Sequence, residues 1–206
     1  MRAMVGSWPV IRSVAIYHLC TVEWPVTSAA MEFPQFQYHP DPLSTGSIKA
    51  SAVVCDCCGM ARGFEYTASF YSPQRSKPRL CPWCIASGEA AQKYDGDFSD
   101  AFPLQEEGIA DNIVDEVSKR TPGYNSWQQE VWESHCEDAC EFHGDAKSAE
   151  LSGLSGRELA EHLDRFGLNF EQWESFVSNY REGGNPAAYK FVCRHCGVSI
   201  YSVDFT

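Results

Sequence analysis

The chain has 206 residues, of which 44% are hydrophobic and 13% aromatic, and its formal net charge is −12. This composition is globular and excludes a chain that is disordered throughout. The negative charge repels phosphate backbones and anionic lipid surfaces, which disfavours binding to nucleic acid or to a membrane. No apolar run reaches the ~18 residues that a membrane-spanning helix needs.

The first thirty residues contain a mildly apolar stretch that Arg12 and His18 interrupt. A secretory signal has a cleaner apolar centre, so residues 1–30 are interpreted as a poorly ordered extension, or as the product of a start assigned too early, with the working protein beginning at Met31. Close cysteine pairs in a chain without an export signal are typical of metal binding in a reducing cytoplasm.

Residues 31–100 are predicted to form a first zinc module of knuckle, hairpin and helix. A short strand over 51–54 leads into the sequence CDCCG at 55–59, where the glycine allows the positive φ of a tight turn that aims backbone N–H groups at sulfur. Alternating aromatic residues predict a strand over 64–70. The sequence CPWC at 81–84 then begins an alanine-rich helix, whose N-terminus favours thiolate. This order is that of a treble clef.

Two alternatives stay open in the first module. Cys57 lies between the knuckle cysteines and could replace Cys58 as a ligand, although tight knuckles prefer two intervening residues. The dithiol of Cys81 and Cys84 also resembles a thioredoxin-like redox pair. No strand–helix–strand pattern surrounds this dithiol, and the pair at 55 and 58 explains the site without redox chemistry.

Residues 101–206 are predicted to form a mainly helical region. Apolar residues spaced i, i+4 indicate a helix over 109–117, and capping-box pairs indicate helices that begin at Ser126, Ser155 and Asn169. The helix after Ser126 is predicted to continue through residue 136. Short strands over 189–192 and 198–203 flank the last cysteines. The fold class is therefore α+β, a treble-clef-like zinc module joined to a helical region that a C-terminal knuckle closes.

The helical region is predicted to hold a second zinc site. Cys136 and Cys140 are four residues apart, so one face of the predicted helix presents both sulfurs. Cys193 and Cys196 belong to a second knuckle, again followed by glycine. Three neighbouring histidines are alternative ligands at this site: His135, His143 and His195.

Eight of the ten cysteines thus fall into four close pairs, and two pairs make one tetrahedral site. The sequence predicts two zinc ions in two closed sites, which leave no position for water or substrate and are therefore structural. The predicted ligands are Cys55, Cys58, Cys81, Cys84, Cys136, Cys140, Cys193 and Cys196.

Several motifs occur in a specific order along the chain. They are YHPDP at 38–42, the knuckle at 55–59, CPWCIA at 81–86, RTPGY at 120–124, WQQE at 127–130 and His135-Cys136. Together they resemble the CbrC family, bacterial cysteine-rich proteins without an assigned activity, over roughly Phe33 to the C-terminus. The resemblance implies a cytoplasmic, zinc-bound protein and supplies no catalytic residues.

Three classes of function are consistent with these features. A structural protein, whose surface binds another protein or a small ligand, follows from two closed zinc sites and from the absence of a phosphate-binding loop, nucleophile elbow or metalloprotease helix. An enzyme could use the Cys81/Cys84 dithiol, or a hydrolase-type site could use polar groups suited to acid–base chemistry. Those groups are His39, Asp41, Glu130, Glu133 and His135. Nucleic-acid binding through Arg75, Lys77 and Arg79 is opposed by the overall charge.

Overall fold

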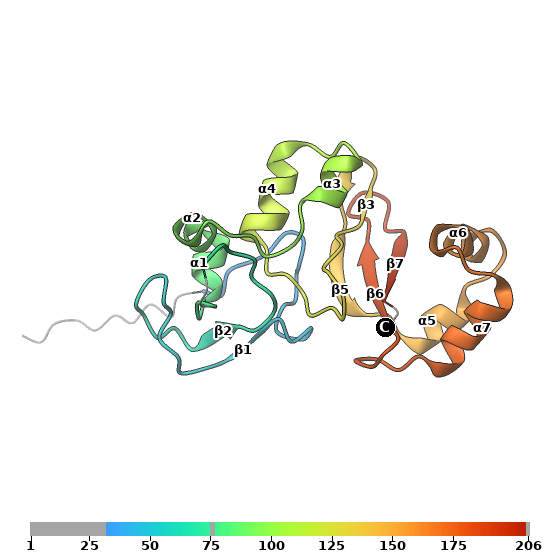
Figure 1. Ribbon diagram of the computed structural model, residues 1–206, viewed down its shortest axis with the longest axis horizontal. Coiled ribbons are helices and arrows are strands. Elements are labelled where there is room, and N and C mark those ends of the chain that lie inside the picture. The colour runs from blue at the N-terminus through green and yellow to red at the C-terminus, as the bar shows by residue number, and fades with distance from the viewer. Residues whose placement is uncertain (1–31, 75–76, 205–206) are drawn as a thin grey trace, which may run out of the picture. The chain divides into compact units, whose positions relative to one another are not determined.

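The computed structural model describes residues 32–74 and 77–204, which form helices and short strands in three small sheets (Figure 1). The helices are α1 (Pro82–Ala86), α2 (Glu89–Tyr94), α3 (Phe102–Glu106), α4 (Asp111–Arg120), α5 (Ser148–Gly153), α6 (Gly156–Phe166) and α7 (Phe170–Asn179). The strands are β1 (Ile48–Ala50), β2 (Phe64–Tyr66), β3 (Ser134–His135), β4 (Asp138–Ala139), β5 (Glu141–Asp145), β6 (Ala187–Val192) and β7 (Ser199–Asp204). The predicted extension over 1–30 and Arg75 lie outside the described residues. Among the residues described, no helix is long and apolar enough to cross a membrane.

The first knuckle lies between the two strands of an antiparallel hairpin. Strand β1 pairs with β2, with Ile48 opposite Tyr66, and a single bridge between Val54 and Ala61 closes the chain nearer the turn. The strand predicted over 64–70 is confirmed only as β2, because the chain then turns away to pair residue 71 with residue 97. The predicted helix after the second cysteine pair is two helices, since Gly88 between them has φ +77.

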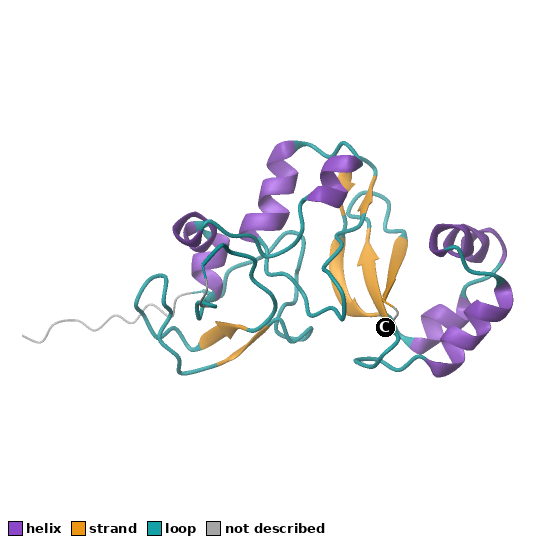
Figure 2. Cartoon of the chain, in the orientation of Figure 1, coloured by secondary structure: helices purple, strands orange, loops and turns teal. Residues whose placement is uncertain are grey.

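The predicted mainly helical region contains a three-stranded antiparallel sheet in the order β5–β6–β7 (Figure 2). Alternate side chains of β6 face opposite sides of this sheet. Tyr189 and Phe191 belong to an aromatic core with Tyr124 and Phe142, whereas Ala188 belongs to a second core formed mainly by α5 and α7. The sheet therefore has a packed layer on each face.

The sequence RTPGY brings Tyr124 into the aromatic core and Gly123 against residues of the first module. The ring of Tyr124 stacks on Phe142 with a centroid separation of 4.2 Å. A Cβ at Gly123 would lie 2.0 Å from the carbonyl oxygen of Phe98 and 2.9 Å from the hydroxyl of Tyr66. Backbone cannot move aside as a flexible side chain can, so only glycine lets these segments approach.

Three of the predicted helices are present. The helix predicted over 109–117 is α4, and those predicted at Ser155 and Asn169 are α6 and α7. At α7 the capping box forms in both directions, since the amide of Gln172 donates to the Asn169 side chain (2.9 Å) and the amide of Asn169 donates to the Gln172 side chain (2.8 Å). At α6 the Ser155 side chain makes no capping bond.

The helix predicted from Ser126 through residue 136 is wrong. The structure has irregular chain over 127–133, followed by β3. Trp127 donates through Nε1 to the carbonyl of Gly184 (2.9 Å), and Glu130 is buried against a tyrosine hydroxyl. One partner lies 57 residues later in the sequence and the other 59 residues earlier, so tertiary contacts outweigh the local capping signal.

His39 of the YHPDP motif is fully buried and fixed at both ring nitrogens. Nδ1 lies 2.7 Å from the carbonyl oxygen of Pro122, and Nε2 lies 2.7 Å from the hydroxyl of Thr45. A neutral ring that donates from Nδ1 and accepts at Nε2 satisfies both contacts. Burial lowers the pKa of His39 from 6.5 to about 4.

This lowered pKa predicts an acid-sensitive contribution to stability. As the pH falls, the unfolded chain takes up the proton first, so the His39 contribution is complete above pH 6.5 and is lost between pH 6.5 and about 4. Relative to a His39→Gln variant, the protein should lose about 3 kcal/mol of unfolding free energy across that window. Urea unfolding at several pH values measures this difference, and metal loss in acid affects both proteins alike. Parallel pH profiles would contradict the prediction.

Candidate metal centres

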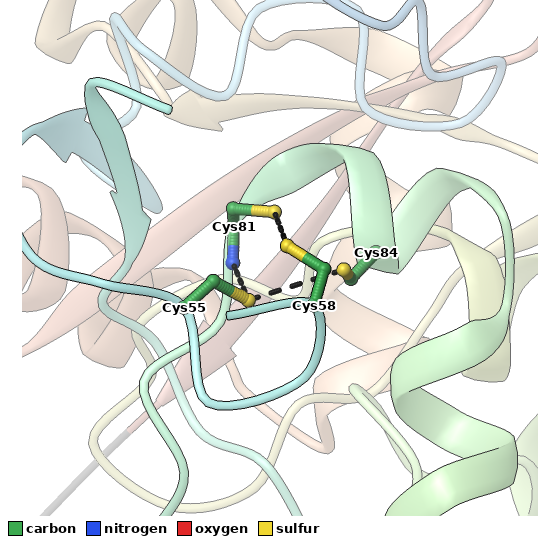
Figure 3. A group of neighbouring side chains, drawn as sticks. All are labelled: Cys55, Cys58, Cys81 and Cys84. Atoms are coloured by element: carbon green, nitrogen blue, oxygen red, sulfur yellow. Dashed lines mark hydrogen bonds between the residues drawn. The ribbon is translucent and has the colours of Figure 1, made fainter. Parts of the chain in front are cut away.

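Four cysteine sulfurs from the knuckle and from α1 converge in the first module, as Figure 3 shows. The sulfurs of Cys55, Cys58, Cys81 and Cys84 all lie within 4.8 Å of one another. Two of the separations, Cys55 to Cys84 and Cys58 to Cys81, are 3.9 Å. A tetrahedral zinc with bonds of ~2.3 Å has sulfurs ~3.8 Å apart. This first centre therefore fits an ion of that size.

The two knuckles have the same backbone hydrogen-bond pattern. In the first, the amide of Cys55 donates to the carbonyl five residues ahead (3.0 Å), and the amide of Gly59 donates back to Cys55 (2.8 Å). In the second, the corresponding bonds of Cys193 and Gly197 are both 2.9 Å. Gly59 has φ +71 and Gly197 has φ +75, which confirms why each knuckle carries a glycine.

Backbone N–H groups donate to the first sulfur of each knuckle, from the start of α1 at the first centre and from the knuckle turn itself at the second. The amide of Cys81 donates to the sulfur of Cys55 (3.3 Å), and that of His195 donates to the sulfur of Cys193 (3.4 Å). Burial raises the pKa of both thiols, but hydrogen bonds from backbone amides outweigh it and lower the pKa of Cys55, and that of Cys193 to about 6. Both turns therefore favour the thiolate that a metal needs.

The CPWC dithiol does not have the environment of a redox nucleophile. Each of its sulfurs has a knuckle sulfur 3.9 Å away. Burial raises the pKa of Cys81 to about 11 and raises that of Cys84 further, whereas a reactive dithiol needs a lowered pKa. Cys57 lies outside the four-sulfur group, in a separate group with Cys84 and Glu89.

At the second centre the structure brings together a different set from the four predicted cysteines. His135, Cys136, Cys193 and Cys196 each offer a ligand atom within 4.8 Å of the others. His135 Nδ1 lies 3.1 Å from the sulfur of Cys136 and 3.4 Å from that of Cys196. Cys140 is outside this group and is fully buried in the aromatic core, where burial raises the pKa of its thiol to about 12.

A tight hairpin presents His135 and Cys136 to the second knuckle. Strands β3 and β4 pair antiparallel and are joined by two residues, Cys136 with φ +54 and Glu137 with φ +60. Two positive φ values define a type I′ turn, which normally uses Asn-Gly. This left-handed backbone conformation costs roughly 1–2 kcal/mol of conformational free energy for each residue that has a Cβ. The hairpin also separates Cys136 from Cys140, which the predicted helix would have placed on one face.

The buried carboxylate of Asp138 connects the hairpin to the second knuckle. It accepts hydrogen bonds from the hydroxyl of Tyr38 (2.8 Å) and from Arg194 Nη1 (3.0 Å), and it lies 2.8 Å from His195 Nε2. Burial raises the pKa of Asp138, but these partners outweigh burial and hold it below the usual value. His195 is thereby held away from the ligand group, and His143 instead contacts Glu141 (3.1 Å).

The polar residues considered for acid–base chemistry have separate partners. His39 is enclosed by backbone and threonine, Asp41 binds the amide of Ser44 (3.1 Å), Glu133 pairs with an arginine of α6, and His135 lies at the second centre. The structure does not gather these side chains into one cleft. In the loop considered for nucleic acid, the guanidinium of Arg79 is paired with Asp56 at 2.7 Å.

The chain is similar to known proteins over nearly all the described residues. A model of an uncharacterised protein family, UPF0167, matches residues 33–205. A UPF0167 protein of Pseudomonas aeruginosa is 52% identical over 174 residues, which cover 84% of this chain and 97% of that relative. UPF0167 proteins of Mycobacterium bovis and Mycobacterium tuberculosis are each 37% identical over 181 residues, 87% of this chain and 97% of theirs. No solved structure shows a significant match.

Proposed function

We propose that this chain, which belongs to the uncharacterised protein family UPF0167, is a zinc-bound protein whose two metal centres stabilise a surface for binding another protein or a small ligand. The convergence of Cys55, Cys58, Cys81 and Cys84 within 4.8 Å carries this proposal. Four thiolates in a tetrahedral arrangement favour zinc over magnesium or calcium, which take oxygen ligands.

The first centre is assigned a structural role in a treble-clef-like module. Three of its four cysteines are buried, and they belong to the same hydrophobic core as Leu80 and Ile85. Four thiolates fill a tetrahedral ion, so no position is left for water or substrate. The knuckle followed by a helix that carries the second pair supports the treble-clef assignment.

For the second centre we assign His135 in place of Cys140, with Cys136, Cys193 and Cys196 as the other ligands. A set of three cysteines and one histidine is a common structural zinc site. The support is the geometry of the described residues, in which His135 Nδ1 is within 3.4 Å of two of the sulfurs. This centre then joins the β3–β4 hairpin to the end of β6.

The assignment to a binding protein extends to its location and partners. Exposed thiolate ligands persist best in a reducing compartment, which supports a cytoplasmic location, as the resemblance to the CbrC family implies. The formal charge of −12 and the pairing of Arg79 with Asp56 oppose nucleic-acid binding. A protein or small-molecule partner is thus favoured.

Metal analysis with thiol titration tests the proposal. The purified chain should contain two zinc ions, and in the native state Cys57 should react with a thiol reagent while the buried ligands of the first centre do not. Chelation followed by denaturation should expose all ten cysteines. A metal-free protein with a reversible disulfide between Cys81 and Cys84 would instead favour the redox function.

A further inference from the structure

We propose that Cys136 and Cys196 form a peroxide-sensitive pair, whose oxidation to a disulfide releases the metal of the second centre while the first centre stays loaded. This inference rests on the proposed binding of metal at both centres. It adds a reversible modification site to a protein whose metal sites would otherwise be purely structural.

The two centres differ in their access to solvent. At the first centre, Cys55 is 3% exposed and Cys81 and Cys84 are each 1% exposed. At the second, Cys136 and Cys196 are both exposed. A small oxidant therefore reaches the sulfurs of the second centre without any opening of the fold.

The side of the second centre that faces α6 is also open. A cavity of about 160 Å³ is lined by His135 together with His162 and Arg165 of α6 and the chain from Val198 to Ile200. Since His135 is itself exposed, two kinds of ligand at this centre face solvent. Only Cys193 is buried there.

The exposed sulfurs are close enough to join. Cys136 and Cys196 have their sulfurs 4.0 Å apart, and a disulfide needs ~2.05 Å, so they must approach by about 2 Å. Cys136 sits on a two-residue turn with φ +54, a conformation that costs free energy in a residue with a Cβ. A metal bond offsets this cost, and its loss allows the hairpin tip to move.

The chemistry balances with a peroxide as the only co-reactant. One thiolate attacks an oxygen of hydrogen peroxide, so that an S–O bond forms, the O–O bond breaks and hydroxide leaves. The second thiolate attacks the resulting sulfenic sulfur, so that the S–S bond forms and the oxygen leaves as hydroxide. Two protons from solvent convert the two hydroxides to water. The two thiolates have lost two electrons in total, and the metal has lost two of its four ligands.

The full-length, zinc-loaded chain provides the test. Treatment with hydrogen peroxide should release one zinc ion per chain, followed with a chromogenic chelator, at least tenfold faster than the second. Alkylation of the remaining thiols and peptide mapping should find a disulfide between Cys136 and Cys196. A dithiol reductant with added zinc should restore the original metal content.

Two variants make the result specific. Cys57→Ser removes another accessible thiol and should release zinc as the unaltered protein does. Cys136→Asp replaces the sulfur ligand with a carboxylate oxygen and cannot form the disulfide, so its second-centre zinc should resist peroxide. Simultaneous release of both ions, or a disulfide between Cys193 and Cys196, would overturn the inference. Two zinc ions that both resist peroxide would defeat this inference alone, whereas a protein that binds no zinc before oxidation would defeat the proposed function as well.

Discussion

Replacement of Cys84 by serine is expected to remove one of two bound zinc ions and to lower the melting temperature by roughly 10 to 20 °C, because a loss of about 5 kcal/mol shifts a domain of this size by about 2–4 °C per kcal/mol. Structural zinc contributes ~10–16 kcal/mol of apparent binding free energy in zinc-finger peptides, which do not fold without it. This longer chain keeps its other cores when the ion is lost, so the expected loss is the smaller value of about 5 kcal/mol. Cys84 is 1% exposed, and its sulfur lies 3.9 Å from that of Cys55. Its loss therefore opens the site and leaves the surrounding core without its cross-link.

Cys57→Ser is the matched control for this experiment. Cys57 lies two residues from Cys55 and is only partly buried, and it is not in the four-sulfur group. The control should keep two zinc ions and melt within a few degrees of the unaltered protein. Zinc content by elemental analysis and thermal unfolding by circular dichroism give both readouts. If Cys57→Ser lost zinc while Cys84→Ser kept it, the ligand assignment would be incorrect.

Local features of the sites were predictable because short spacings determine them. Two residues between cysteines, followed by glycine, fix a turn whose amides point at sulfur, and both knuckles have this turn. The capping box at α7 was readable for the same reason, since Asn169 and Gln172 bond each other directly. In both cases the interacting groups are neighbours in the sequence.

The segment before the second centre was not predictable in this way. Trp127 donates to a carbonyl 57 residues later, and Glu130 accepts a hydrogen bond from the hydroxyl of Tyr71, 59 residues earlier. A capping-box pattern at Ser126 carries no information about such partners. Strand β5 was missed as well, because its pairing partner β6 lies beyond three intervening helices. The pairing of strands so far apart in the sequence is difficult to predict from local residue patterns.

The second centre combines both kinds of information. Its knuckle is local, and the spacing identified Cys193 and Cys196. The other two ligand positions depend on whether residues 134–140 form a helix or a hairpin. In a helix Cys136 and Cys140 share a face, whereas in the β3–β4 hairpin the tip presents His135 and Cys136 and the chain carries Cys140 into the core. The ligand set thus follows from the backbone conformation.

The two centres also differ in what they connect. The ligands of the first come from residues 55–84, so this site can form from one stretch of chain. Those of the second are about 60 residues apart and enclose β5, α5–α7 and β6. Closing such a long loop costs only slightly more entropy than closing a short one, so the metal remains an effective cross-link. Removal of the metal is expected to loosen the connection between β6 and β7 and to leave the first module folded.

Replacement of His135 by alanine is expected to lower the zinc affinity of the second centre by at least 100-fold. Mutation of a residue that only hydrogen-bonds a ligand already lowers metal affinity about 10–100-fold, and loss of a ligand itself lowers it further. Cys140→Ala is the matched control, because it removes the other candidate for the fourth ligand position. Cys140 is buried in the aromatic core, so the control should lose about 1–2 kcal/mol of stability and keep two zinc ions. Competition with a chelator of known affinity measures the zinc bound at each centre.

The outcome decides between the two ligand sets because each predicts a different variant to fail. If His135 is a ligand, only His135→Ala releases a single zinc ion at moderate chelator concentration. If Cys140→Ala releases that ion and His135→Ala retains it, the four-cysteine set that the spacing predicted is correct and the hairpin must differ when metal is bound. Because His135 is exposed, its replacement leaves the core intact, so zinc loss in that variant reports the missing ligand and not unfolding.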